Sequence, residues 1–168
     1  MAESGWALVV GASRGLGLGL AAEVKSRGWN VVGTVRDAAG ERRLQVLAGK
    51  PGGELRVEHL DINDDAAIAA LHQRLDGTVF DLVFVNAGIA PQGRGDAAGA
   101  SRDEAAAIFM TNAVAPIRVA RAFLDRVRNG SGIIAFMSSG LGSVANKTDS
   151  YSELYSASKA ALNSSRAA

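Results

Sequence analysis

The sequence has 168 residues, of which 48% are hydrophobic and 21% are charged, and this predicts a single globular domain, 1–168, and excludes a disordered chain. Lys and Arg together number 18 and Asp and Glu 17, so the charge balance excludes the basic surface of a nucleic-acid-binding protein. The lack of cysteine excludes a disulfide framework and a thiol nucleophile. No apolar run has membrane-spanning length and the first residues lack a secretion-signal pattern, so we expect a soluble, cytoplasmic protein without a membrane partner.

The first apolar run, Trp6–Val10, leads directly into a glycine-rich turn and then into a predicted helix. A short continuous apolar run is typical of a strand buried on both faces of a parallel sheet. A glycine turn between such a strand and a helix brings free N–H groups close to a phosphate, which predicts dinucleotide binding. Alternatively, the turn needs small residues only for packing, as we expect for Gly19. The residues expected at the cofactor are Gly11, Ser13, Arg14, Gly15, Leu16 and Gly17.

The second predicted strand, Asn30–Val35, ends next to Arg36 and Asp37. In a dinucleotide-binding fold this strand end meets the adenosine ribose, where an acid suits a 2′-hydroxyl and an arginine suits a 2′-phosphate. Arg36 and Arg14 together therefore favour NADP(H) over NAD(H). In the alternative interpretation, Arg36 is a surface residue that pairs with Asp37.

The third predicted strand, 54–60, ends at Asp61 and Ile62. A carboxylate and an apolar side chain at this position fit the edge and the face of an adenine ring. Asn63 or Asp64 is expected to cap the helix that follows.

The fourth predicted strand, 81–85, runs into Asn86, Ala87 and Gly88. Small residues and an asparagine at the carboxyl end of a buried strand suit close approach to a ligand in the crevice of a parallel sheet. Helices are predicted between the strands, including one at 41–48, so the pattern indicates an α/β fold.

The segment 101–128 is predicted to form one long helix that begins with a capping box. Pro116 has no N–H to donate to the carbonyl of Asn112, so we expect a kink there and a freed carbonyl that holds a water. Alternatively, Pro116 only bends the helix around the sheet. The last predicted strand, 132–137, leads to Ser139, whose hydroxyl suits a hydrogen bond to a substrate oxygen.

Tyr155 and Lys159 are four residues apart in a predicted helix, so their side chains lie on one face. A nearby ammonium favours the phenolate form of a tyrosine and suits it to proton transfer near neutral pH. On its own, the pair is equally explained by a solvated helix face.

Taken together, these motifs occur in the order found in the short-chain dehydrogenase/reductase family, which the chain resembles over essentially its whole length. The resemblance implies a Rossmann-type doubly wound parallel sheet in three α/β/α layers. It also implies hydride transfer between nicotinamide and a small carbonyl or alcohol substrate, with Tyr155 as the acid or base. Lys159 would favour the phenolate and bind the nicotinamide ribose, and Ser139 would position the substrate oxygen. The implied catalytic tetrad is Asn112, Ser139, Tyr155 and Lys159. The further implied cofactor contacts are Asp61, Ile62, Asn86, Ala87, Gly88, Tyr155 and Lys159.

Three departures from the family pattern stand out. Val10 and Val85 replace a threonine and an asparagine that are common in the family, and the spacing from Ser139 to Tyr155 is a few residues longer than usual. The longer spacing is similar to that of the C-factor-like carbonyl reductases. Members of the family normally continue beyond residue 168 through two further strands, so we expect either a fragment or a short form completed in a homodimer or homotetramer.

Alternative assignments remain at three points. The protein is either an active oxidoreductase or a truncated NADP-binding protein without turnover, whereas a methyltransferase would not explain the Tyr155 and Lys159 pair. Ser139 is preferred to Ser138 because it is the second serine of the pair. Tyr155 is preferred to Tyr151 because no lysine follows Tyr151 by four residues.

Overall fold

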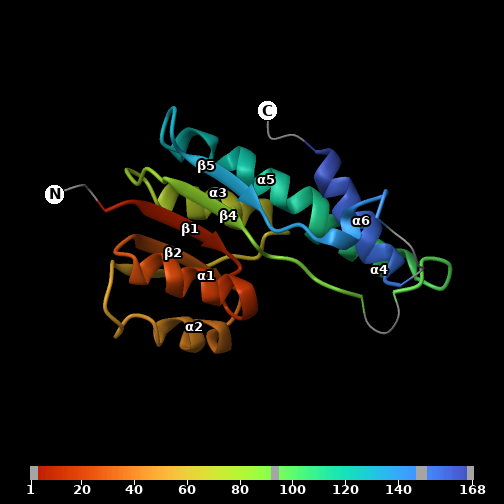
Figure 1. The fold of residues 1–168 in the computed structure, drawn as a ribbon, viewed down its shortest axis with the longest axis horizontal. Coiled ribbons are helices and arrows are strands. Elements are labelled where there is room, and N and C mark those ends of the chain that lie inside the picture. Colours follow the sequence, from red (N-terminus) through yellow and green to blue (C-terminus); the bar gives the residue numbers. More distant parts are fainter. Residues whose placement is uncertain (1–3, 92–94, 147–150, 166–168) are drawn as a thin grey trace.

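A computed structural model describes residues 4–91, 95–146 and 151–165. Its strands are all parallel and form one sheet in the order β3-β2-β1-β4-β5 (Figure 1). The strands are β1 (Trp6–Val10), β2 (Asn30–Val35), β3 (Leu55–His59), β4 (Leu82–Val85) and β5 (Ile133–Phe136). Because the chain runs outward from β1 through β2 and β3 and then returns to β4, the strand order reverses between β1 and β4. This topology confirms the predicted doubly wound sheet, in which ligands bind at the reversal point.

Helices cover both faces of the sheet (Figure 1). The helices are α1 (Gly15–Ser26), α2 (Ala38–Gln45), α3 (Asp65–Arg74), α4 (Arg102–Phe109), α5 (Ala115–Ala122) and α6 (Glu153–Ser164), of which α1 and α2 pack on one face and α3 and α5 on the other. Alternate side chains of β1 enter two different cores: Leu8 packs with α3 and α5, and Val9 packs with α1 and α2. This burial on both faces explains why β1 is a continuous apolar run rather than an alternating one.

Two helix starts depend on aspartate side chains. Asp64, rather than Asn63, caps α3 by accepting hydrogen bonds from Ala66 N and Ala67 N. Asp37 caps α2 by accepting from Gly40 N, so α2 begins at residue 38 and the predicted start at residue 41 was wrong. A capping carboxylate satisfies N–H groups that the first helical turn leaves free.

The predicted helix at 101–128 begins as expected, with Ser101 Oγ accepting a hydrogen bond from Glu104 N, but it is not one regular helix and its predicted end at residue 128 was wrong. The structure has α4, one π-helical turn at Met110–Val114, and then α5, which ends at Ala122. Pro116 lies in the first turn of α5, where a missing N–H is tolerated. The helix cannot extend to residue 128 because Val127 is in an extended conformation and forms a parallel bridge with Phe80.

The last three strands are each one or two residues shorter than predicted, within the usual uncertainty of element ends. β3 and β5 lie at the two edges of the described sheet, and Ile133 of β5 is 58% exposed. α6 packs against α4 and the π-helical turn, beyond the carboxyl ends of β4 and β5 (Figure 1). This arrangement brings the Tyr155 and Lys159 segment to the ligand-binding end of the sheet.

Candidate active site

The glycine turn after β1 is held from both sides. Gly11 N donates to Thr34 Oγ1 of β2, and Asn86 Nδ2, just after β4, donates to the Gly11 carbonyl oxygen, each at 3.0 Å. Gly11 has a φ of +85°, and a Cβ there would lie 2.9 Å from the Ala87 backbone. A Cβ on Gly17 would overlap the Gly11 carbonyl. Both glycines are therefore needed for the close approach of turn, helix and β4.

Gly15 and Gly19 have a different role from these two. Apart from its chain neighbours and the backbone of its own helix, a Cβ at either position would meet no described atom within 4 Å. Gly15 has a φ of +53° and opens α1 in the left-handed region, a conformation that favours glycine. The expectation that Gly19 is required for packing is wrong for the described part of the chain.

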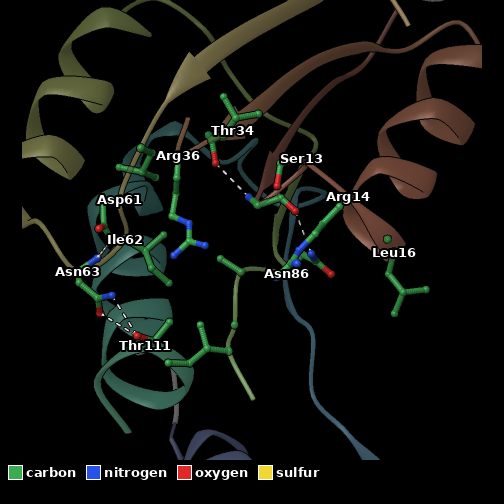
Figure 2. Close-up of a pocket in the computed structure, with 17 residues that line it drawn as sticks. Ser13, Arg14, Leu16, Thr34, Arg36, Asp61, Ile62, Asn63, Asn86 and Thr111 are labelled. Atoms are coloured by element: carbon green, nitrogen blue, oxygen red, sulfur yellow. Dashed lines mark hydrogen bonds between the residues drawn. The ribbon is translucent and has the colours of Figure 1, made fainter. Parts of the chain in front are cut away.

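A cleft of about 330 Å³ lies between the glycine turn and the carboxyl ends of the strands (Figure 2). Eleven of the predicted cofactor residues line it: Gly11, Ser13, Arg14, Gly15, Leu16, Arg36, Asp61, Ile62, Asn86, Ala87 and Gly88. Gly17 is buried behind the turn. Sequence reasoning assigned no cofactor contact to the remaining lining residues, which are Thr34, Val35, Leu60, Asn63, Ile89 and Thr111.

Two arginines that line the cleft carry uncompensated positive charge. Arg14 and Arg36 form no ion pair with any carboxylate of the described chain, and Figure 2 shows the Arg36 side chain pointing into the cleft. No Arg36–Asp37 ion pair forms, contrary to the alternative interpretation. The hydrogen bond from Gly40 N, partly opposed by desolvation, holds the pKa of Asp37 below its usual range, with smaller contributions from nearby arginines. The unpaired Arg14 and Arg36 side chains suit an anion such as a phosphate.

The cleft also has an apolar surface next to a hydrogen-bonded side-chain pair. Ile62 is 4% exposed, and Asp61 Oδ1 accepts from Asn63 N at 2.9 Å. The Asn63 side chain donates to Thr111 Oγ1 at 3.0 Å, which connects the loop after β3 with the π-helical turn (Figure 2). An apolar wall with a few polar groups at its margin suits a planar base.

Tyr155 and Lys159 line a second cavity of about 410 Å³. Lys159 is 2% exposed, and its ammonium donates to the Met137 carbonyl at 2.8 Å and lies 5.8 Å from the Tyr155 ring centroid. Burial lowers the pKa of Lys159 from its ordinary value. This cavity shares four lining residues with the cleft: Arg14, Asn86, Gly88 and Ile89. The two cavities therefore adjoin at the carboxyl end of β4.

Asn112 lies in the π-helical turn and is fully buried. Its side chain bonds to both main-chain groups of Ile89 and donates to Ser158 Oγ at 3.0 Å. Ser158 Oγ in turn donates to the Tyr155 carbonyl at 2.7 Å. Sequence reasoning missed Ser158, although its position between Tyr155 and Lys159 on α6 was a signal for it.

The two serines after β5 have different partners. Ser138 Oγ donates to Asn163 Oδ1 at 2.6 Å, whereas Ser139 Oγ accepts from Leu141 N at 3.2 Å and caps a short 3-10 helix, Gly140–Gly142. Among the described residues lining the two cavities, Ser139 does not appear. The structure thus brings together Asn112, Tyr155 and Lys159 but not Ser139, and the catalytic role of all four residues stays a prediction.

The two candidate tyrosines differ in their exposure. Tyr151 is 59% exposed, whereas Tyr155 is half-buried and lines the cavity with Lys159. Residues 147–150 of the long loop lie outside the described residues. Tyr155, rather than Tyr151, is therefore placed for proton transfer beside an ammonium.

Comparisons with known proteins agree with this geometry. A family model described as enoyl-(acyl carrier protein) reductase matches residues 11–167. Human 17-beta-hydroxysteroid dehydrogenase type 1 is 33% identical over 162 residues, which are 92% of this chain and 48% of the human protein. The chain belongs to the short-chain dehydrogenase/reductase family. It spans about half the length of its first curated relatives.

Two solved structures are similar in both sequence and fold. A Burkholderia multivorans protein described as a short-chain dehydrogenase/reductase with bound NADP has 45% identity and a TM-score of 0.89, over 95% of this chain and 69% of that one. A carbonyl reductase from Pseudomonas aeruginosa in complex with NADP has 41% identity and a TM-score of 0.90, over 96% and 70% of the two chains. Within the described part of the chain, no helix has the length and apolar character needed to cross a membrane.

Proposed function

We propose that the protein is an NADP(H)-dependent oxidoreductase that interconverts a small carbonyl compound and the corresponding alcohol, with Tyr155 as the acid or base. The observation that carries this proposal is the buried Lys159 ammonium beside the Tyr155 ring, in a cavity that adjoins the phosphate-suited cleft. Membership of a family whose relatives are named dehydrogenases and reductases supports the reaction type.

The residues of the cleft fit a dinucleotide carrying a 2′-phosphate. The first turn of α1 has N–H groups without helical partners, Arg14 and Arg36 suit the extra phosphate, and Ile62 suits the adenine face. Two similar structures with bound NADP support the same choice of cofactor. When bound, the cofactor supplies or accepts the hydride.

In the proposed reaction, each group of this chain has one task. In the reducing direction, the Tyr155 hydroxyl donates its proton to the carbonyl oxygen of the substrate, and in the reverse direction the phenolate removes the alcohol proton. Lys159, held by the Met137 carbonyl, favours the phenolate through its charge. The Asn112 side chain has all its described hydrogen bonds to Ile89 and Ser158, so only its main-chain carbonyl is proposed to hold a relay water.

The experiment that tests this proposal measures NADPH oxidation with a panel of carbonyl compounds. Tyr155→Phe is expected to lower the rate by at least about a hundredfold, the lower end of the usual contribution of a general acid. Tyr151→Phe is the matched control, since it removes an exposed phenol from the same region, and should retain the wild-type rate. Equal rates for wild type and Tyr155→Phe would overturn the assignment.

The second candidate function is an NADP-binding protein without turnover. The observation that favours it is the Ser139 hydroxyl, which accepts a hydrogen bond from Leu141 N and lines neither described cavity. Such a protein would enhance NADPH fluorescence on binding, yet would oxidise NADPH with no carbonyl compound of the panel. A measurable rate with any compound, lost in Tyr155→Phe, excludes this candidate.

The remaining features of the proposal are the cellular context and the assembly. We propose a cytoplasmic protein of a single domain that acts on a small molecule and assembles as a homodimer or homotetramer. A native mass measured in solution tests the assembly, and a monomer at all concentrations would contradict it.

A further inference from the structure

Arg43 connects α2 directly to the glycine turn. It is exposed on α2, and its Nε donates to the Ser13 carbonyl oxygen at 2.9 Å across 30 residues of sequence. No described carboxylate forms an ion pair with its guanidinium, as is also true of Arg14 and Arg36. Arg43 and Arg36 both contribute to lowering the pKa of Asp37, so both lie near its carboxylate. The Arg43 and Arg36 charges therefore lie near each other, beside the Asp37 carboxylate.

The glycine turn packs closely on the first turn of α2. A Cβ on Gly40 would lie only 2.8 Å from Ser13 Cβ, so Ser13 rests against the helix. Ser13 and Arg14 both line the cleft, and the Ser13 carbonyl belongs to the peptide that joins them. A hydrogen bond to that carbonyl restricts the rotation of the peptide and therefore the direction in which Arg14 leaves the backbone.

The position of α2 does not depend on Arg43. Leu44 is fully buried against Gly33, Asp37 caps the helix, and Glu41 Oε2 lies 3.1 Å from His59 Nε2 of β3. Removal of the Arg43 side chain should therefore leave α2 in place and change only the rim of the cleft.

We propose that Arg43 is a specificity-determining residue of the cofactor cleft. It holds the Ser13–Arg14 peptide through its Nε and adds its charge near that of Arg36, and so selects an adenosine that carries a phosphate on its ribose. The inference rests on the proposed NADP(H) function. Its physical basis is that guanidinium groups bind phosphate oxygens through strong charge-assisted hydrogen bonds in a defined geometry.

The test compares binding of adenosine 2′,5′-bisphosphate with binding of AMP by titration calorimetry. Neither ligand carries nicotinamide, so the measurement is independent of turnover. Arg43→Ala is expected to weaken binding of the bisphosphate by about tenfold or more, the effect of losing one hydrogen bond to a charged group. Its effect on AMP should be about twofold or less. AMP carries no 2′-phosphate, so any attraction between the Arg43 charge and AMP acts through solvent and is screened.

Arg42→Ala is the matched control. Arg42 is the neighbouring residue on α2, carries the same charge and is exposed, and no hydrogen bond or ion pair joins its side chain to a described residue. It should lose about twofold or less for either ligand, since it acts only through long-range charge. Equal losses in Arg42→Ala and Arg43→Ala would overturn the inference. Thermal unfolding of both variants checks that the fold is kept.

Arg43→Lys separates the positive charge of Arg43 from its geometry, the hydrogen bond that holds the Ser13–Arg14 peptide. Lysine keeps the charge but lacks the planar fork, so the variant should still bind the bisphosphate more weakly than wild type does. Wild-type affinity in Arg43→Lys would overturn the positioning role. If the wild-type protein binds the bisphosphate and AMP with equal affinity, the proposed NADP(H) preference fails. If the wild-type protein prefers the bisphosphate but Arg43→Ala loses no more affinity than Arg42→Ala, only the Arg43 inference fails.

Discussion

The Asn112 side chain pairs with the main chain of Ile89 through two hydrogen bonds: Nδ2 donates to the Ile89 carbonyl oxygen and Oδ1 accepts from the Ile89 N–H, each at 2.8 Å. Ile89 follows Gly88 at the cofactor cleft, and Asn112 lies in the π-helical turn. The pair therefore joins the loop after β4 to the helix that supports α6. π-Helical turns are frequent at functional sites, where they displace a residue from the regular helical register.

Asn112→Leu is expected to destabilise the fold by about 2–4 kcal/mol, because it leaves the Ile89 N–H and carbonyl without partners in a partly buried site. Urea unfolding measures the free energy. Asn163→Leu is the control: Asn163 is exposed on α6 and bonds with Ser138 and Gly142, so its loss should cost less. Equal costs for the two variants would contradict the structural role of the Asn112 amide.

Ser158 is predicted to position Tyr155 rather than to contact substrate. Its buried hydroxyl accepts from Asn112 and donates to the Tyr155 carbonyl, so Ser158→Ala should loosen the turn of α6 that carries the phenol. We expect kcat to fall by about tenfold with little change in KM, as for the loss of about 1.4 kcal/mol felt mainly in the transition state. Steady-state kinetics measure this split.

The control for Ser158 is Ser164→Ala on the same helix. Ser164 makes the same kind of bond to a carbonyl three residues earlier, that of Ala161, but it is exposed. Its removal should leave kcat and KM unchanged. A rise in KM without a fall in kcat for Ser158→Ala would point to substrate contact instead of positioning.

Arg36→Ala should weaken NADPH binding much more than NADH binding, because the Arg36 side chain points into the cleft and no described carboxylate pairs with it (Figure 2). We expect a loss of about tenfold or more for NADPH, from the removal of a charge-assisted hydrogen bond to phosphate. Fluorescence titration with each nucleotide measures it. Equal losses for NADPH and NADH would refute the phosphate role.

The sequence predicted the sheet and most of the cleft because these depend on local signals. β1 and β2 have the predicted bounds, since each is a short apolar run bounded by residues that end a strand. The end of the 101–128 helix was wrong because a distant residue, Phe80, pairs with Val127. Arg43 and Ser158 were missed for the same reason: their partners, Ser13 and Asn112, are 30 and 46 residues away.

The Asp81 carboxylate joins three parts of the sheet at the end opposite the cleft. It precedes β4, accepts from Trp6 N of β1 at 2.9 Å, and forms an ion pair with Arg128 ahead of β5. The hydrogen bond from Arg128 is the main cause that holds the pKa of Asp81 below its usual range, and the Trp6 N–H adds to it. A folded-state pKa below the unfolded one means that the unfolded chain binds more protons in acid.

The stability from Asp81 is therefore fully present above the unfolded pKa of about 3.9 and is lost as the pH falls through the lower folded-state pKa. Asp81→Asn should lower the free energy of unfolding at neutral pH by about 1–3 kcal/mol, the usual cost of weakening hydrogen bonds to a charged group. The difference from wild type should shrink in acid, below the unfolded pKa. Urea unfolding across this pH range measures both effects.

Asp103→Asn is the control, because Asp103 is exposed and no described residue bonds to its carboxylate, so its difference should stay small at every pH. A difference for Asp81→Asn that persists unchanged in acid would contradict the charge-dependent contribution of this carboxylate.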